Sequence, residues 1–162
     1  MEQNEYYTYC VNDLINHYKE RDFIQMAYDY DEILMLKGIK MEAAKTFFTE
    51  IKSDYTFSLT TSVLKAIEYD NEPILISLNH EWKNIHFDTV YEGATLNDDL
   101  VTAIGTEPVE IIHINKDKDI KLADKCISFL GLEPGDIILI EALSEGFVIS
   151  KFTEENIKSY YP

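Results

Sequence analysis

The sequence predicts an α+β fold, in which an N-terminal helical unit is followed by a mostly antiparallel β region. In the first third of the chain, apolar residues recur at the three- and four-residue spacing of a helix face. The remainder breaks into short apolar runs of strand length, separated by Gly, Pro and Asn. Hydrophobic residues make up 46% of the 162 residues, which is enough to build a core.

The helical unit is predicted from periodicity and from capping residues. A first helix is expected over residues 5–20, and Asp22 is a suitable N-cap for a second helix that ends at Gly38. A third helix is predicted over residues 40–52, with a buried face formed by Met41, Ala44, Phe47, Phe48 and Ile51. The three helices together would form a unit of about 55 residues.

The β region is predicted from its apolar runs and turn residues. Strands are expected at residues 74–78, 82–91, 109–114, 137–143 and 147–152, the last two joined as a hairpin by Ser144, Glu145 and Gly146. Short helices are expected at 97–104, capped by Asn97, and at 122–130. Segment 56–59 fits a strand or a helix entry, and 63–67 is ambiguous. The expected divisions are 1–55, 56–108 and 109–162, or one compact domain that contains all three.

Negative charge is the dominant property of the sequence. The chain has 30 acidic and 14 basic residues, a net charge of −16, and Arg21 is its sole arginine. Such a surface repels nucleic acids and anionic membranes and attracts basic proteins, so we expect no direct contact with nucleic acid and no membrane partner. The alternative is that the acidity only maintains solubility.

The middle segment carries the strongest charge imbalance. Between residues 59 and 110, ten acids stand against the two bases Lys65 and Lys83. Tyrosines flank some of these acids, and tyrosine is enriched at protein interfaces. The predicted partner-binding residues are therefore Glu68, Tyr69, Asp70, Glu72, Glu81, Asp88, Tyr91, Glu92, Asp98 and Asp99.

These observations predict a non-enzymatic binding protein. Its carboxylates would replace phosphates in the basic site of a nucleic-acid-binding protein and so inhibit that partner. Phage anti-restriction and anti-CRISPR factors are proteins of this size and charge. No apolar run reaches the roughly 18 residues of a membrane span, and the acidic N-terminal residues do not form a signal-peptide pattern. We therefore expect a cytoplasmic protein, with Cys10 and Cys126 as reduced thiols in the core.

The last third carries a recognisable motif. The run Leu-Gly-Leu-Glu-Pro-Gly-Asp at 130–136 follows the predicted helix and precedes the hairpin. Gly131 suits a left-handed C-cap, Pro134-Gly135 a tight turn, and Asp136 a side chain that bonds the amides of that turn. With these residues, segment 109–152 resembles the SpoVT/AbrB–MazE swapped-hairpin family. The resemblance implies a homodimer and an alternative function as an AbrB/MazE-like antitoxin or transcriptional regulator.

The segment also departs from that family. Its DNA-binding members use basic residues, often arginine, on the first strand and turn, whereas acids alternate with lysines here at 116–121. Ala123 stands where a proline is usual, and the segment is C-terminal instead of N-terminal. DNA binding through this segment is therefore not what the sequence favours.

Catalytic and metal-binding patterns are absent from the sequence. His80 and His86 lie near acids, but their spacing matches no familiar ligand pattern. Cys126 beside His113 could suggest a nucleophile and its base, but Cys126 lies in an apolar run and is expected in the core. We expect no cofactor, no metal and no catalytic residue. The remaining alternative, a small enzyme or metalloprotein, would need a polar pocket around His80 and His86.

Overall fold

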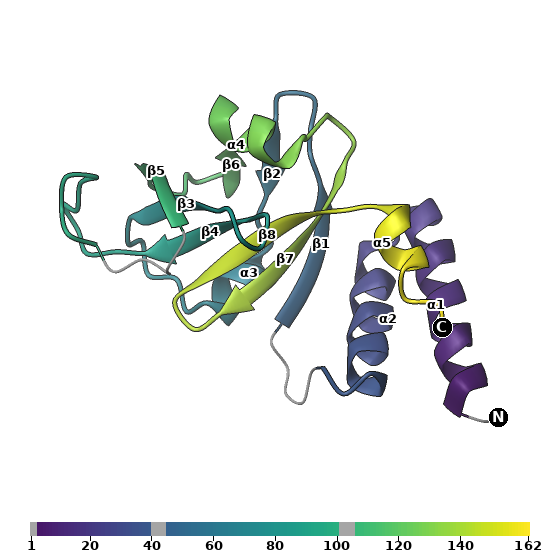
Figure 1. The fold of residues 1–162 in the computed structure, drawn as a ribbon. Coiled ribbons are helices and arrows are strands. Elements are labelled where there is room, and N and C mark those ends of the chain that lie inside the picture. The colour runs from purple at the N-terminus through teal and green to yellow at the C-terminus, as the bar shows by residue number, and fades with distance from the viewer. Residues whose placement is uncertain (1–2, 40–44, 101–105) are drawn as a thin grey trace.

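A six-stranded antiparallel sheet forms the centre of the molecule (Figure 1). The computed structural model describes residues 3–39, 45–100 and 106–162. The strand order is β1-β7-β8-β4-β3-β5, with strands at Lys45–Glu50 (β1), Ile74–Asn79 (β3), Asn84–Thr89 (β4), Thr106–Ile112 (β5), Ile137–Leu143 (β7) and Gly146–Phe152 (β8). The predicted α+β class is confirmed. Strands from all three expected divisions of the chain take part in this one sheet.

Three helices pack on one side of the sheet. They are α1 (Gln3–Glu20), α2 (Phe23–Leu36) and the C-terminal α5 (Glu154–Lys158), which lies beside α1 (Figure 1). The Asp22 carboxylate accepts the Gln25 amide at 3.2 Å and caps α2 as predicted, and Gly38 beyond its end adopts a φ of 73°. None of the described helices combines the length and the apolarity that crossing a bilayer requires.

The predicted third helix is wrong. Residues 45–50 form strand β1, which pairs antiparallel with β7, and residues 40–44 lie outside the described part of the chain. Phe48 packs in the core under the helices, whereas its neighbour Phe47 packs against the core on the opposite face of the sheet. In a strand, adjacent side chains point to opposite faces, so Phe47 and Phe48 can each pack in a different core. Packing in both cores favours the strand over the helix that the apolar spacing predicted.

Two short elements follow β1 in the chain. Segment 56–59 contains strand β2 (Thr56–Ser58), which pairs with β6 (Asp119–Lys121). The ambiguous segment 63–67 forms the end of α3 (Thr61–Ala66) and its C-cap, Ile67. The helix predicted from Asn97 is wrong within residues 97–100, and residues 101–105 lie outside the described part. There the Asp98 carboxylate bonds backward to the Thr95 amide at 2.8 Å, so it forms a turn instead of starting a helix.

The last third follows its predicted order of elements. Helix α4 (Asp124–Leu130) ends at Gly131, which has the left-handed φ of 65°, and Gly135 adopts a φ of 91°. The Asp136 carboxylate accepts the Glu133 amide at 2.8 Å, as expected for this turn. The β7–β8 hairpin follows, and its outer edges pair with β1 and β4 of the same chain.

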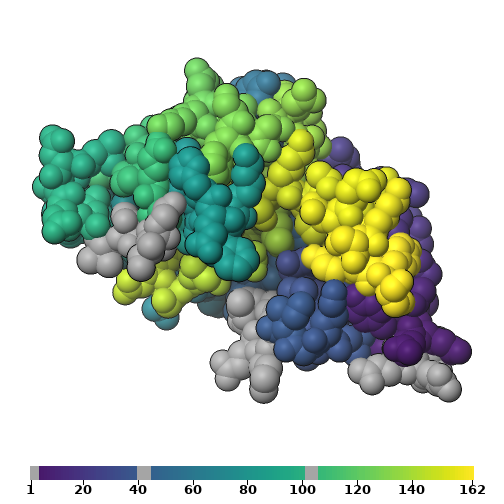
Figure 2. Space-filling model, viewed as in Figure 1, coloured from purple at the N-terminus to yellow at the C-terminus, as the bar shows by residue number. Residues whose placement is uncertain are grey.

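The sheet separates two apolar clusters. Phe87 and Phe147 stack with ring centroids 4.5 Å apart in the cluster that α3 and α4 cover. Phe48 and Phe152, 4.8 Å apart, lie with Tyr30 in the cluster under α1 and α2. Helix α2 packs on β1, and the cluster under α1 and α2 includes Ile137 and Leu139 of β7. The 90–100 loop projects from the far side of the molecule (Figure 2).

Candidate functional site

Strand pairing gathers several acidic segments at one end of the sheet. Ile74 at the start of β3 pairs with Thr89 at the end of β4 and with Ile112 at the end of β5. The Val90 amide donates to the Pro73 carbonyl at 2.9 Å, and the Thr89 amide donates to the Glu145 carbonyl at 2.9 Å. The loops 67–73 and 90–100 and the 144–145 turn therefore emerge side by side.

These loops carry a set of acids that we call the acidic end. Its members are Glu68, Asp70, Glu72, Glu92, Asp98, Asp99 and Glu145. Five of them are exposed, and only Glu72 and Asp98 are half-buried. Tyr91 stands among them with 58% of its surface exposed. Nine of the ten predicted partner-binding residues thus lie in or beside this end of the sheet. They come together because β3 pairs with both β4 and β5.

Two acids of this end shape their own loops. The Asp98 carboxylate accepts the Tyr91 hydroxyl at 2.6 Å, and this bond lowers the pKa of Asp98. The Glu72 carboxylate accepts the Asp70 amide at 2.8 Å, and the Tyr69 hydroxyl donates to the Glu72 carbonyl. Tyr69 packs its ring against the core, so it supports the loop more than it faces solvent. The exposed carboxylates of the acidic end are Glu68, Asp70, Glu92, Asp99 and Glu145.

Asp88 lies at the edge of the acidic end. It is on β4 beside Leu75 and Gly146, and it is half-buried. Burial raises the pKa of its carboxyl, the charge of Glu145 raises it further, and His86 on the same strand opposes both. Asp88 therefore adds negative potential to this end but presents little surface.

Glu81 is the one predicted partner-binding residue placed elsewhere. It lies in the turn between β3 and β4, at the opposite end of the sheet. Sequence proximity to the other acids does not bring it near them, because a strand of six residues intervenes. Glu145, in contrast, belongs to the acidic end although the sequence analysis did not select it. The predicted hairpin turn was the signal that could have found it.

Two lysines flank the acidic end. Lys45 and Lys65 line a shallow hollow of about 550 Å³ with Glu68, the last two residues of β7 and Ser144. His113 at the end of β5 pairs with Glu92, at 3.4 Å. Within the described residues, acids thus outnumber bases at this end, and the surplus charge faces solvent.

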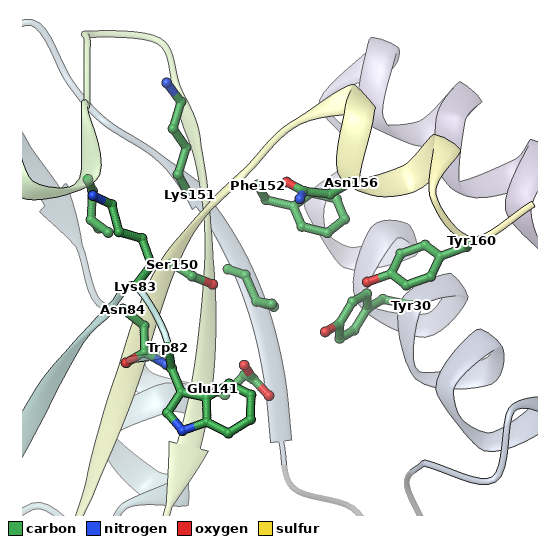
Figure 3. A pocket seen from close by; sticks show the side chains of 12 residues that line it. Tyr30, Trp82, Lys83, Asn84, Glu141, Ser150, Lys151, Phe152, Asn156 and Tyr160 are labelled. Carbon is green, nitrogen blue, oxygen red and sulfur yellow. The ribbon is translucent and has the colours of Figure 1, made fainter. Parts of the chain in front are cut away.

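A second concave feature, the interlayer cleft, lies between the sheet and the helical layer (Figure 3). It has a volume of about 420 Å³, within the range of small-molecule sites. The sheet and its β3–β4 turn contribute Trp82, Asn84, Glu141, Ser150 and Phe152, and the helical side contributes Tyr30, Asn156 and Tyr160. Sequence analysis missed the cleft, because its walls come from segments far apart in the chain.

The chemistry of the interlayer cleft favours binding over catalysis. Burial raises the pKa of Tyr30 and of Tyr160, so both phenols stay protonated and act as hydrogen-bond donors. The Oδ1 atom of Asn84 is buried and has no hydrogen-bond partner among the described residues. The amino groups of Lys83 and Lys151 point away from the opening, toward the Phe129 ring and the Gly131 carbonyl (Figure 3). Neither histidine nor cysteine lines the cleft in the described part of the chain.

The remaining candidates for chemistry are dispersed. His80 pairs with Glu107 at 3.1 Å, whereas His86 contacts the Asn79 amide at 3.3 Å, so these two histidines serve separate contacts. Cys10 and Cys126 are free, buried thiols, as predicted, and burial raises the pKa of both. His113 is exposed, whereas Cys126 is buried in the core. These positions offer no pairing of nucleophile and base.

Comparison with known proteins adds no assignment, since no family model and no curated protein matches the chain. The resemblance of segment 109–152 to the SpoVT/AbrB–MazE family remains a prediction from its motif.

Proposed function

We propose that this protein is a non-enzymatic inhibitor that binds the basic, nucleic-acid-binding surface of a cytoplasmic partner protein. The observation that carries the proposal is the gathering of acids from three segments at one end of the sheet. Exposed carboxylates there would replace phosphates and accept hydrogen bonds from the partner's Lys and Arg side chains. Tyr91 would add an aromatic contact within the charged surface.

The structure refines the choice of residues for a test. Glu72 and Asp98 hold their loops, so replacing them would change loop shape as well as charge. Glu68, Asp70, Glu92 and Asp99 are exposed, so charge can be reversed there with less effect on the fold. A variant with all four changed to Lys tests the surface. A matched control reverses four exposed acids elsewhere, namely Glu20, Asp117, Glu133 and Glu155.

The experiment is capture from host lysate with tagged protein at about 0.15 M salt, with and without nuclease. We expect the native chain to retain a nucleic-acid-binding protein after nuclease treatment and to release it at high salt. The acidic-end variant should lose that protein, while the control variant keeps it. Capture that needs intact nucleic acid, or equal capture by both variants, would contradict the proposal.

The alternative function, an AbrB/MazE-like antitoxin or regulator, receives less support from the side-chain contacts. Lys118 donates to the Thr61 hydroxyl at 2.9 Å and Lys121 to the Asp54 carbonyl at 3.2 Å, so two lysines of the 116–121 stretch bind their own chain. The hairpin that family members interleave in a dimer is paired on both edges here. A monomer in sedimentation velocity would weigh against this alternative, and a homodimer would favour it.

A further inference from the structure

A compact group of metal-ligating side chains lies on the helical layer, apart from both the acidic end and the interlayer cleft. Asp13 and His17 stand four residues apart on α1, and therefore on the same helix face. Asp29 comes from the facing side of α2. Each residue offers one donor atom, and the three atoms all lie within 4.8 Å of one another. Among the described residues, this is the only group of three or more such donors that lie this close together.

The side chains are held in place by their surroundings. All three residues are half-buried, and the His17 Nδ1 atom lies 2.5 Å from the Asp29 Oδ2 atom. The helices that carry them pack tightly through Leu14, Met26 and Ile33, which are fully buried. The donor atoms thus project from a well-packed helix pair, so side-chain movement alone is needed to bring them around one ion.

The charges around this group are unbalanced. Asp29 shares this group with the Asp13 carboxylate, and the Asp22 carboxylate at the start of α2 adds a third negative charge nearby. The nearest bases in sequence are directed elsewhere. Arg21 pairs with Glu50 at 2.7 Å, and Lys19 lies 3.7 Å from Glu154. Two carboxylates of the group and a third nearby therefore face a single imidazole, and a bound cation would relieve their repulsion.

We propose that Asp13, His17 and Asp29 form a binding site for a divalent transition-metal ion of the zinc class, which links helices α1 and α2. The donor set determines the class, because imidazole nitrogen suits zinc and its neighbours whereas Mg²⁺ and Ca²⁺ prefer oxygen ligands only. Donors around one zinc ion at about 2.1 Å lie roughly 3.4 Å apart. On zinc binding, the donor atoms of His17 and Asp29 would therefore move apart by about 1 Å, and the Asp13 carboxylate would move closer by a side-chain rotation. Water would occupy the fourth coordination position of the zinc ion.

The test uses the full chain, purified without a polyhistidine tag, and Zn²⁺ as the probe. We expect isothermal titration calorimetry to show one saturable site per chain. The D13N variant should bind at least about tenfold more weakly, since it removes a charged ligand but keeps the His17–Asp29 ion pair and hence the fold. The E20Q variant is the matched control, because it removes one exposed charge from the end of the same helix, and it should bind like the native chain.

Thermal unfolding gives a second readout. Zn²⁺ should raise the Tm of the native chain and of E20Q, and should raise that of D13N much less, because only a ligand bound to the folded state stabilises it. Equal zinc affinity in all three proteins, or several weak sites in each, would overturn the proposal and leave His17 and Asp29 as an ion pair alone. Equal binding of Mg²⁺ at the same concentration would overturn the assigned metal class.

Discussion

The hydroxyl of Tyr91 donates a 2.6 Å hydrogen bond to the carboxylate of Asp98, seven positions further along the chain. The same carboxylate accepts the Thr95 amide at 2.8 Å. Both hydrogen bonds of Asp98 thus lie within its own loop and stabilise the shape of that loop. The same loop carries the exposed carboxylates of Glu92 and Asp99. In this arrangement Asp98 shapes the loop that presents two other acids of the acidic end, Glu92 and Asp99.

Removing the Tyr91 hydroxyl should change the titration of Asp98. The bond to Tyr91 is the main reason that the pKa of Asp98 lies below its ordinary value, so Tyr91→Phe should shift this pKa upward. Carbon-detected NMR of the carboxyl groups across pH 2 to 7 would measure the shift. Tyr9→Phe alters an exposed tyrosine far from this loop, on α1, and should leave the pKa of Asp98 unchanged. An Asp98 pKa that is the same in all three proteins would show that the hydrogen bond does not persist in solution.

The half-buried carboxyl of Asp88 should destabilise the fold at neutral pH. Its folded-state pKa is raised, mainly by burial, so its favourable contribution is present below the unfolded pKa of about 4 and is lost as pH rises through the folded value. Asp88→Asn should therefore unfold at higher urea concentration than the native chain at pH 7. The difference should shrink as pH falls through the raised folded pKa, and it should be gone below the unfolded value of about 4. A gain that stays constant with pH would exclude ionisation of Asp88 as its cause.

Local patterns in the sequence were sufficient for much of the fold. Asp22 and Gly131 cap or end helices through contacts within a few residues, and both were correctly predicted. Phe47 and Phe48 were placed wrongly, because their positions depend on two cores that distant segments build. Helical spacing and an apolar strand buried on both faces cannot be told apart over so short a run.

The candidate sites depend even more on distant pairing. Acid content predicted most members of the acidic end, but only the pairing of β3 with β4 and β5 shows why Glu81 is remote and Glu145 is near. Asp13 and His17 have the i, i+4 spacing of a shared helix face, which the sequence does contain. Their convergence with Asp29 requires the packing of α1 on α2, and no sequence spacing encodes that rotation.

Gly146 should tolerate no side chain. A Cβ atom there would lie 2.0 Å from the backbone oxygen of Phe87, and backbone in the middle of a sheet cannot move away cheaply. Gly146→Ala should therefore cost about 3 kcal/mol or more of unfolding free energy, the upper range for overpacking. The neighbouring Glu145→Ala, at an exposed position, should change it by only about 0.5 kcal/mol. Urea unfolding of both variants provides the comparison, and equal losses would mean that β4 and β8 are not closely paired at this point.

Phe48 and Phe47 offer a test of strand β1 itself. Phe48 is 6% exposed and contacts the rings of Phe152 and Tyr30, with centroids 4.8 and 5.7 Å away. Phe48→Ala should therefore cost about 3–5 kcal/mol of unfolding free energy, as expected for an aromatic removed from a core.

The neighbouring Phe47 is only half-buried, so Phe47→Ala should cost less, about 1–2 kcal/mol. The two losses should also differ in location. Hydrogen exchange should show the Phe48 variant loosening α1 and α2, which cover that face, and the Phe47 variant loosening the opposite core around α3. On a helix, both rings would lie within about 100° of each other on one face, and both variants would loosen the same elements. Protection lost from the same elements in both variants would therefore contradict strand β1, whatever the size of the two energies.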